Sequence, residues 1–153
     1  MIFRRYYNLK SKKSAKEVTA KLLGNTFNVH NLSFEITQRD NNIKVIPHAE
    51  KSEKIYTLPI TRLKVTDNKT GSSIKMMSKP RRIDIGGPYL LLIFIFFAIV
   101  AAFVIYFYKK DYINSAYVLA IVALFTFIIL WIRMEMGYFD YIRKIKKHIQ
   151  SLI

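Results

Sequence analysis

Residues 88–132 contain two long apolar runs around which the rest of the chain is organised. The first, PYLLLIFIFFAIVAAFVIYFY, covers residues 88–108, and the second, YINSAYVLAIVALFTFIILWI, covers residues 112–132. Neither run carries a charged residue. Each has about 20 residues, which as a helix reach about 30 Å, the thickness of the hydrocarbon core of a bilayer. We therefore predict that both runs cross a membrane as helices.

The alternative is a pair of core helices in a soluble protein, but neither run has a polar stripe with a period of 3.6 residues. The connection, residues 109–111, allows the chain only to turn back, so the spans should form an antiparallel hairpin. Aromatic side chains, which favour the headgroup level of a bilayer, stand at the ends of the runs: Tyr89, Tyr106, Tyr108, Tyr112 and Trp131.

The basic residues set the expected orientation. Of the 25 lysines and arginines, eighteen lie in residues 1–87, five in residues 133–153 and two in the connection. Positive flanking segments stay on the cytoplasmic side, and Met1 to Lys21 has no apolar signal sequence. We expect both termini in the cytoplasm, in a multi-pass protein of a bacterial cytoplasmic membrane. The residues expected at the surface of anionic lipids are Lys79, Arg81, Arg82, Arg133, Arg143, Lys144, Lys146 and Lys147.

The net charge of +15 is also compatible with nucleic-acid binding. We rank that partner below an anionic bilayer, because the arginines are not interleaved with the aromatic residues that stack on bases. The chain has no cysteine, which excludes disulfides, thiol nucleophiles and thiolate metal sites.

Residues 1–87 should form a small cytoplasmic α+β domain. Ser14 and Glu17 have the spacing of a capping box, which predicts a helix over residues 15–23. Gly24 fits the left-handed position that follows such a helix. The helix should cover one face of a sheet.

The sheet should have four or five mainly antiparallel strands. Leu32, Phe34 and Ile36 alternate with polar residues, which is the two-residue period of a strand. A turn at residues 40–42 leads to a return strand that Pro47 should end, and Pro59 suggests a sheet edge or a break. The other expected strands are residues 2–9, 55–66 and 73–77.

The segments on either side of the spans have different expected roles. Gly86 and Gly87, followed by Pro88, predict a hinge-like turn into the first span. Residues 133–153 should continue helically as a basic amphipathic helix, which lies in the inner headgroup region or packs under the N-terminal domain; a short coiled coil is the alternative. Gly137 should mark a bend before this helix.

Small residues in the spans predict close helix contact. At similar depths of the hairpin, Ala98 and Ala102 of the first span should face the alanines of the second, which are Ala116, Ala120 and Ala123. Within the spans, Thr126 should donate its hydroxyl hydrogen to the preceding helical turn.

Residues with the potential for chemistry are few and scattered. His30, His48 and His148 lie in separate elements, and no spacing indicates a metal site, a cofactor site or a nucleophile. No charged residue lies inside a span, where a transport pathway would need one.

The leading hypothesis is therefore a non-enzymatic, membrane-anchored interaction or regulatory module, with an unidentified protein or a second copy of the chain as its partner. One alternative is an oligomeric small channel or an accessory subunit of a membrane transport complex. Another is an interfacial lipid-modifying enzyme with a site around residues 79–84, in which Asp84, His30 and His48 would meet.

Overall fold

The computed structural model describes residues 3–30, 32–39, 42–48, 57–108 and 110–153. Residues 40–41 of the expected turn, residues 55–56 of an expected strand and Lys109 of the hairpin connection lie outside them. The chain forms two compact units. The sheet unit comprises residues 1–81 and 137–153, and the hairpin unit comprises residues 82–136.

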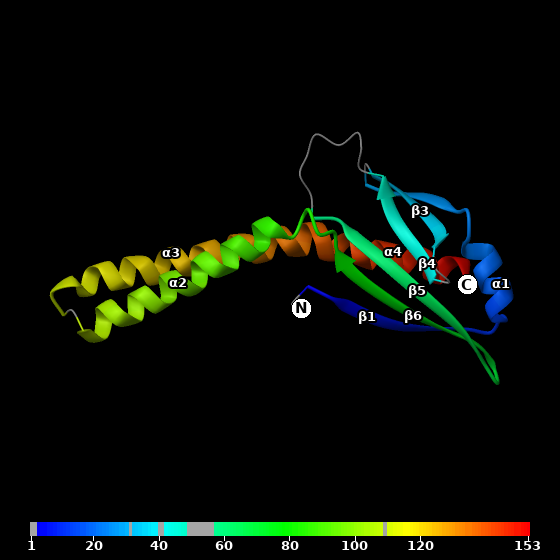
Figure 1. Cartoon of the computed structure of the whole chain (residues 1–153), viewed down its shortest axis with the longest axis horizontal. Coiled ribbons are helices and arrows are strands. Elements are labelled where there is room, and N and C mark those ends of the chain that lie inside the picture. Colours follow the sequence, from blue (N-terminus) through cyan, green and yellow to red (C-terminus); the bar gives the residue numbers. More distant parts are fainter. Residues whose placement is uncertain (1–2, 31, 40–41, 49–56, 109) are drawn as a thin grey trace. The chain divides into compact units, whose positions relative to one another are not determined.

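The sheet unit is built on a curled antiparallel sheet of six strands in the order β1-β6-β5-β4-β3-β2 (Figure 1). The expected four or five strands were therefore too few. The strand that the sequence did not reveal is β2, whose four residues are too short a run to display a clear alternation. The strands are β1 (Arg5–Ser11), β2 (Thr26–Val29), β3 (Leu32–Arg39), β4 (Asn42–His48), β5 (Pro59–Asn68) and β6 (Gly71–Pro80).

Both prolines are accommodated inside the strands. Pro47 continues β4 instead of ending it, because β5 pairs only with residues 43–45 of β4, so the proline lies where that side has no paired neighbour. Pro59 is the first residue of β5, a position at which a missing N–H does not interrupt the ladder.

Helix α1 (Ala15–Leu22) begins at the predicted capping box. The Glu17 N–H donates to Ser14 Oγ at 3.3 Å, and the Ser14 N–H donates to Glu17 Oε2 at 3.2 Å. Asp67 of β5 accepts a further hydrogen bond, at 2.6 Å, from the Ala15 N–H. Gly24 has the predicted left-handed backbone, with φ +77°.

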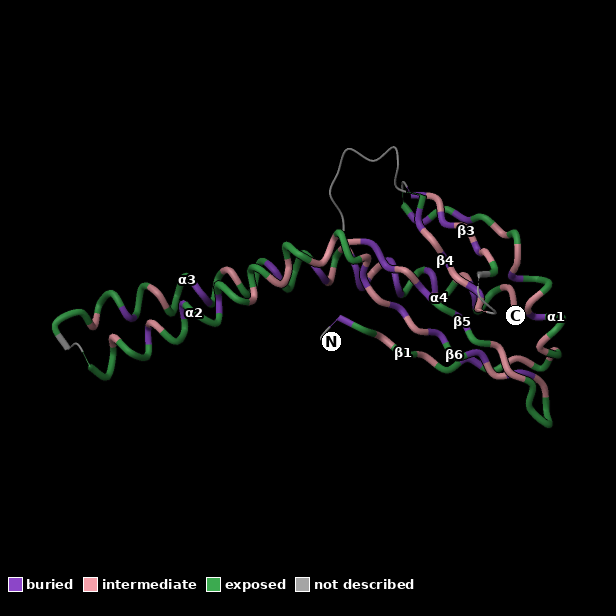
Figure 2. The backbone as a smooth tube through the Cα atoms, viewed as in Figure 1, coloured by how far each residue is buried: buried purple, intermediate pink, exposed green. Residues whose placement is uncertain are grey.

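The core lies between the inner face of the sheet and two helices, α1 and α4 (Asp140–Leu152). Helix α4 contributes Ile142, Ile145 and Ile149, all fully buried, and α1 contributes Val18 and Leu22. Along the strands, buried residues alternate with more accessible ones, as Figure 2 shows. The sheet unit thus needs residues from both sides of the hairpin in the sequence.

The hairpin unit consists of α2 (Gly86–Tyr108), a short 3₁₀ turn (Lys110–Tyr112) and α3 (Ile113–Met134). The two helices pack along each other (Figure 1) and are both long and apolar enough to cross a membrane. The hydroxyl of Thr126 donates to the carbonyl of Val122 at 2.8 Å, as predicted.

The predicted division between the second span and a C-terminal helix was wrong: a single long helical run extends from Ile113 to Leu152. Helix α3 passes through a five-residue π-helical stretch, Glu135–Phe139, directly into α4. Gly137 lies within this stretch. A π-helical turn accommodates an additional residue without breaking the helix, so the change in sequence pattern does not end the element.

Candidate functional site

The side chains of α2 and α3 form an extensive exposed apolar surface. Only 17% of the most apolar window of each helical run is buried within the structure, whereas the core helix of a soluble protein is mostly buried. Exposed aromatic residues include Phe97 and Phe103 on α2 and Phe125 and Trp131 on α3. Such a surface needs an apolar environment.

The predicted alanines differ in their surroundings. Four of the five are buried, namely Ala98, Ala102, Ala116 and Ala123, whereas Ala120 is exposed. Ala102, Ala116, Ala120 and Ala123 line a crevice of about 910 Å³ along the hairpin, bordered by larger side chains such as Phe103 and Tyr117. Among the described residues, no charged side chain lines this crevice.

The three residues of the predicted hinge lie in the first turn of α2. Gly86 and Gly87 are helical and exposed, and Pro88 follows them as the third residue of the helix. The turn that leads into α2 is formed by residues 82–85.

The basic residues predicted at the membrane surface are distributed over both units. Arg82 and Arg133 are exposed and belong to the hairpin unit. Lys79 and Arg81, at the end of β6 and just after it, are half-buried. The remaining four project from α4.

Helix α4 packs against the sheet, which is one of the two placements considered from the sequence. Its apolar side is buried in the core of the sheet unit. Three of its basic residues contact other side chains of the sheet unit: Lys146 Nζ lies 4.7 Å from the centre of the Tyr7 ring, and Arg143 and Lys144 pair with Asp140. Lys147 is exposed.

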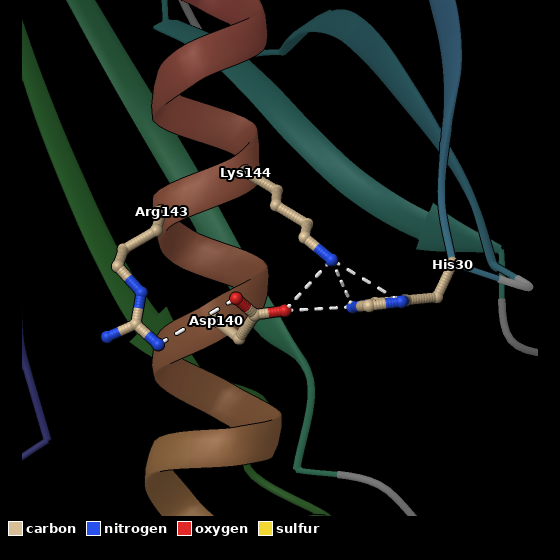
Figure 3. Close-up of polar contacts among 4 residues, drawn as sticks. All are labelled: His30, Asp140, Arg143 and Lys144. Carbon is tan, nitrogen blue, oxygen red and sulfur yellow. Dashed lines mark hydrogen bonds and ion pairs between the residues drawn. The ribbon is translucent and has the colours of Figure 1, made fainter.

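A four-residue polar cluster joins α4 to the turn between β2 and β3 (Figure 3). His30 Nε2 lies 2.8 Å from Asp140 Oδ2 and 2.7 Å from Lys144 Nζ. Lys144 Nζ is 3.1 Å from Asp140 Oδ2, and an Arg143 guanidinium nitrogen is 3.7 Å from Asp140 Oδ1. His30 has a left-handed backbone with φ +53°, and its side chain points toward Asp140 and Lys144 of α4 (Figure 3).

Protonation decides which contacts of the cluster are hydrogen bonds. When His30 Nε2 carries a hydrogen, in the neutral Nε2–H tautomer or in the protonated ring, it donates to Asp140. When the hydrogen is on Nδ1 alone, Nε2 accepts from Lys144; one nitrogen cannot do both. Partial burial raises the pKa of Asp140, but hydrogen bonds from His30 and Lys144, and the charge of Lys144, outweigh it and place this pKa below its ordinary value. Asp140 therefore stays ionised near neutral pH.

The cluster links helix α4 to the turn that follows β2. His30 and Lys144 are nearly half exposed, and ion pairs with such exposure stabilise a fold by at most about 1 kcal/mol. The contact holds the end of β2 on α4.

The other two histidines have separate surroundings. His48 pairs with Glu35 at 2.8 Å on neighbouring strands, and His148 stacks on Phe27 with ring centroids 4.0 Å apart. Within the described ranges, no three His, Asp or Glu side chains are grouped so as to hold a metal ion. His30 and His48 each have a carboxylate partner of their own.

Sequence reasoning did not find the pairing of His30 with Asp140, which are 110 positions apart. No local pattern could reveal it, since it depends on how α4 crosses the sheet. Comparison of the chain with protein-family models, curated proteins and solved structures finds no match.

Proposed function

We propose that this chain is a non-enzymatic, membrane-anchored interaction module, with its hairpin in a bacterial cytoplasmic membrane and its sheet unit in the cytoplasm. The observation that carries the proposal is the exposed apolar surface of α2 and α3, of which only 17% of the most apolar window is buried. A bilayer supplies the apolar environment that this surface needs.

The chain path supports the same side of the membrane for both termini. Both ends of the hairpin unit continue into the sheet unit, at residues 81–82 and 136–137. The sheet unit also holds 21 of the 25 lysines and arginines but only 7 of the 10 acidic residues. Positive charge of this kind is retained in the cytoplasm.

Two features favour an interaction module over an enzyme or a channel. The polar cluster at His30 links the turn after β2 to α4, and the pair of His48 with Glu35 links β4 to β3, so both groups have a structural role. The hairpin crevice has no charged lining residue that would support an aqueous pathway.

Cysteine labelling tests the topology directly, because the chain has no cysteine of its own. We would introduce Asp111→Cys at the hairpin tip and, separately, Gln150→Cys on α4, both exposed positions. In right-side-out membrane vesicles, an impermeant maleimide should label the tip and should reach position 150 only after permeabilisation. Release of the protein from the membrane by carbonate, or labelling of both positions from outside, would refute the anchored topology.

Photo-crosslinking in cells tests the interaction function. A photo-reactive residue at Glu35 or Lys64 on the sheet should capture a discrete protein or lipid. A matched probe at Lys16 on α1 reports random encounters. Capture of only other copies of this chain, together with a multimer in nanodiscs, would favour the oligomeric membrane component instead.

A further inference from the structure

The face of the sheet opposite to α1 and α4 carries a concentration of positive charge. Strand register assigns residues to this outer face, since directly paired residues of neighbouring strands point to the same side. Four neighbouring strands, β1, β6, β5 and β4, contribute to it. We call the following residues the cationic face: Lys10, Lys44, Arg62, Lys64, Lys75 and Lys79.

Like charges oppose each other directly within the cationic face. Lys64 of β5 pairs with Lys75 of β6, and Arg62 of β5 pairs with Lys44 of β4. Among the described residues of these four strands, none on the outer side is acidic; the next strand, β3, places Glu35 on the same face, where it pairs with His48. Like charges directly opposite each other destabilise a sheet, so this arrangement opposes folding.

From the cationic face we infer a docking surface for an anionic lipid bilayer, an inference that rests on the proposed anchoring of the hairpin. Anionic headgroups would neutralise the opposed charges, and basic residues near such a surface are strongly attracted to it. The hairpin would hold the sheet unit close to lipid, so docking would occur at a high effective concentration.

The form of the surface favours a bilayer over a small anion. Four strands about 4.8 Å apart spread the charges over about 14 Å. A surface of this width contacts several lipid headgroups rather than one small anion. The curl of the sheet around α1 and α4 makes this face convex. Tyr6, 65% exposed, pairs with Met77, which pairs with Arg62, so an amphipathic ring and an apolar side chain lie beside the charges.

A spectroscopic label next to the charges can report lipid contact in the full-length protein. Asn8 is exposed and pairs with Lys75, so Asn8→Cys provides a labelling site on the cationic face. We would attach a fluorophore there and measure quenching by bromine-labelled lipids in nanodiscs. One set would contain phosphatidylglycerol in phosphatidylcholine, and the other phosphatidylcholine alone.

We expect quenching with the anionic lipid and little with phosphatidylcholine, and we expect high salt to abolish the difference. Lys64→Gln with Lys75→Gln should lower the ratio of docked to undocked protein about 30-fold, because two attractive charges are lost. Lys16→Gln with Lys21→Gln, which removes two charges from α1, should change the ratio of docked to undocked protein much less. These two lysines are exposed and lie on the helix that covers the other face.

Several outcomes would overturn the inference. They are a label that stays unquenched with phosphatidylglycerol in a folded and inserted protein, and equal effects of the two double variants. A label that stays unquenched by the brominated lipids but changes its fluorescence when an acidic protein is added would assign the face to a protein partner instead. Failure of the protein to insert, measured by carbonate extraction, would refute the proposed anchoring and is distinguishable from these results.

Discussion

The ring of His148 lies against the ring of Phe27, and burial lowers the pKa of this histidine below its ordinary value. The unfolded chain then binds the proton more readily than the folded one. The contribution to stability is therefore present above pH 6.5 and is lost as the pH falls through the ordinary histidine value toward the lowered one.

We predict that His148→Phe, which keeps an aromatic stack, makes the unfolding free energy of the sheet unit less dependent on pH between 7 and 5. Hydrogen exchange of strand amides in nanodiscs measures this free energy. An unchanged pH dependence in the variant would show that His148 is not responsible.

Tyr138 anchors the start of the chain through a buried hydrogen bond. Its hydroxyl donates to the carbonyl of Phe3 at 2.7 Å, and its side chain is almost fully buried. Burial raises its pKa, so the hydroxyl keeps its hydrogen at any physiological pH. Tyr138→Phe leaves that carbonyl without its donor, and we predict a loss of about 1–2 kcal/mol of unfolding free energy.

The matched control is Tyr6→Phe, in which the hydroxyl removed belongs to an exposed side chain. Thermal unfolding followed by circular dichroism should show a lower midpoint for Tyr138→Phe than for Tyr6→Phe. Equal midpoints would mean that the hydrogen bond to Phe3 contributes no net stability.

Gly71 begins β6 in a backbone conformation that other residues adopt only with strain, with φ +136°. A Cβ atom there would lie 2.2 Å from the carbonyl oxygen of Ser11 in the neighbouring strand. We predict that Gly71→Ala destabilises the sheet unit by more than about 1 kcal/mol. Gly87→Ala is the control, because the space around its Cβ is open and alanine favours the helix; a similar loss in both variants would contradict the steric argument.

At the scale of elements, the hairpin depends on where its small residues lie. Ala123 is fully buried, whereas Ala120, one turn earlier on α3, is exposed. Ala123→Leu should force the helices apart at a cost of about 1–3 kcal/mol, and Ala120→Leu should be tolerated. Unfolding of the hairpin in detergent, followed by Trp131 fluorescence, compares them, and equal stability of the two variants would refute the packing.

Elements with local signals could be predicted from the sequence, and those that depend on distant partners could not. Ser14 and Glu17 determine the start of α1 through hydrogen bonds within a few residues, so their pattern was sufficient. By contrast, β2 is held by its pairing with β3, and Pro47 is tolerated because of where β5 stops pairing.

Of the two candidate surfaces, the apolar hairpin could be predicted from local sequence, whereas the cationic face depends on distant partners. The apolar runs were evident from composition alone, since a membrane imposes length and hydrophobicity directly. The cationic face was not, because its lysines and arginines are interspersed with apolar residues along each strand. Only the register, which places Lys64 opposite Lys75, brings them together.

At the scale of the whole molecule, the sheet unit is discontinuous in sequence, because α4 follows the hairpin yet fills the centre of the sheet's inner face. Tyr138, Ile142, Ile145 and Ile149 of the helical run are all buried there. Residues 1–81 alone would leave the part of the inner face that α4 covers exposed to water. The sheet unit should therefore complete its folding only after the hairpin has been synthesised.

We predict that a chain truncated after Met136 inserts its hairpin but leaves residues 1–81 sensitive to protease, while the full-length chain is resistant. Within the full-length chain, Ile145→Asp places an unpaired charge in the core and should reproduce the sensitivity. Lys147→Asp, at an exposed position on the same helix, should not. Limited proteolysis in nanodiscs measures all four proteins, and a protease-resistant sheet in the truncated chain would show that residues 1–81 fold without α4.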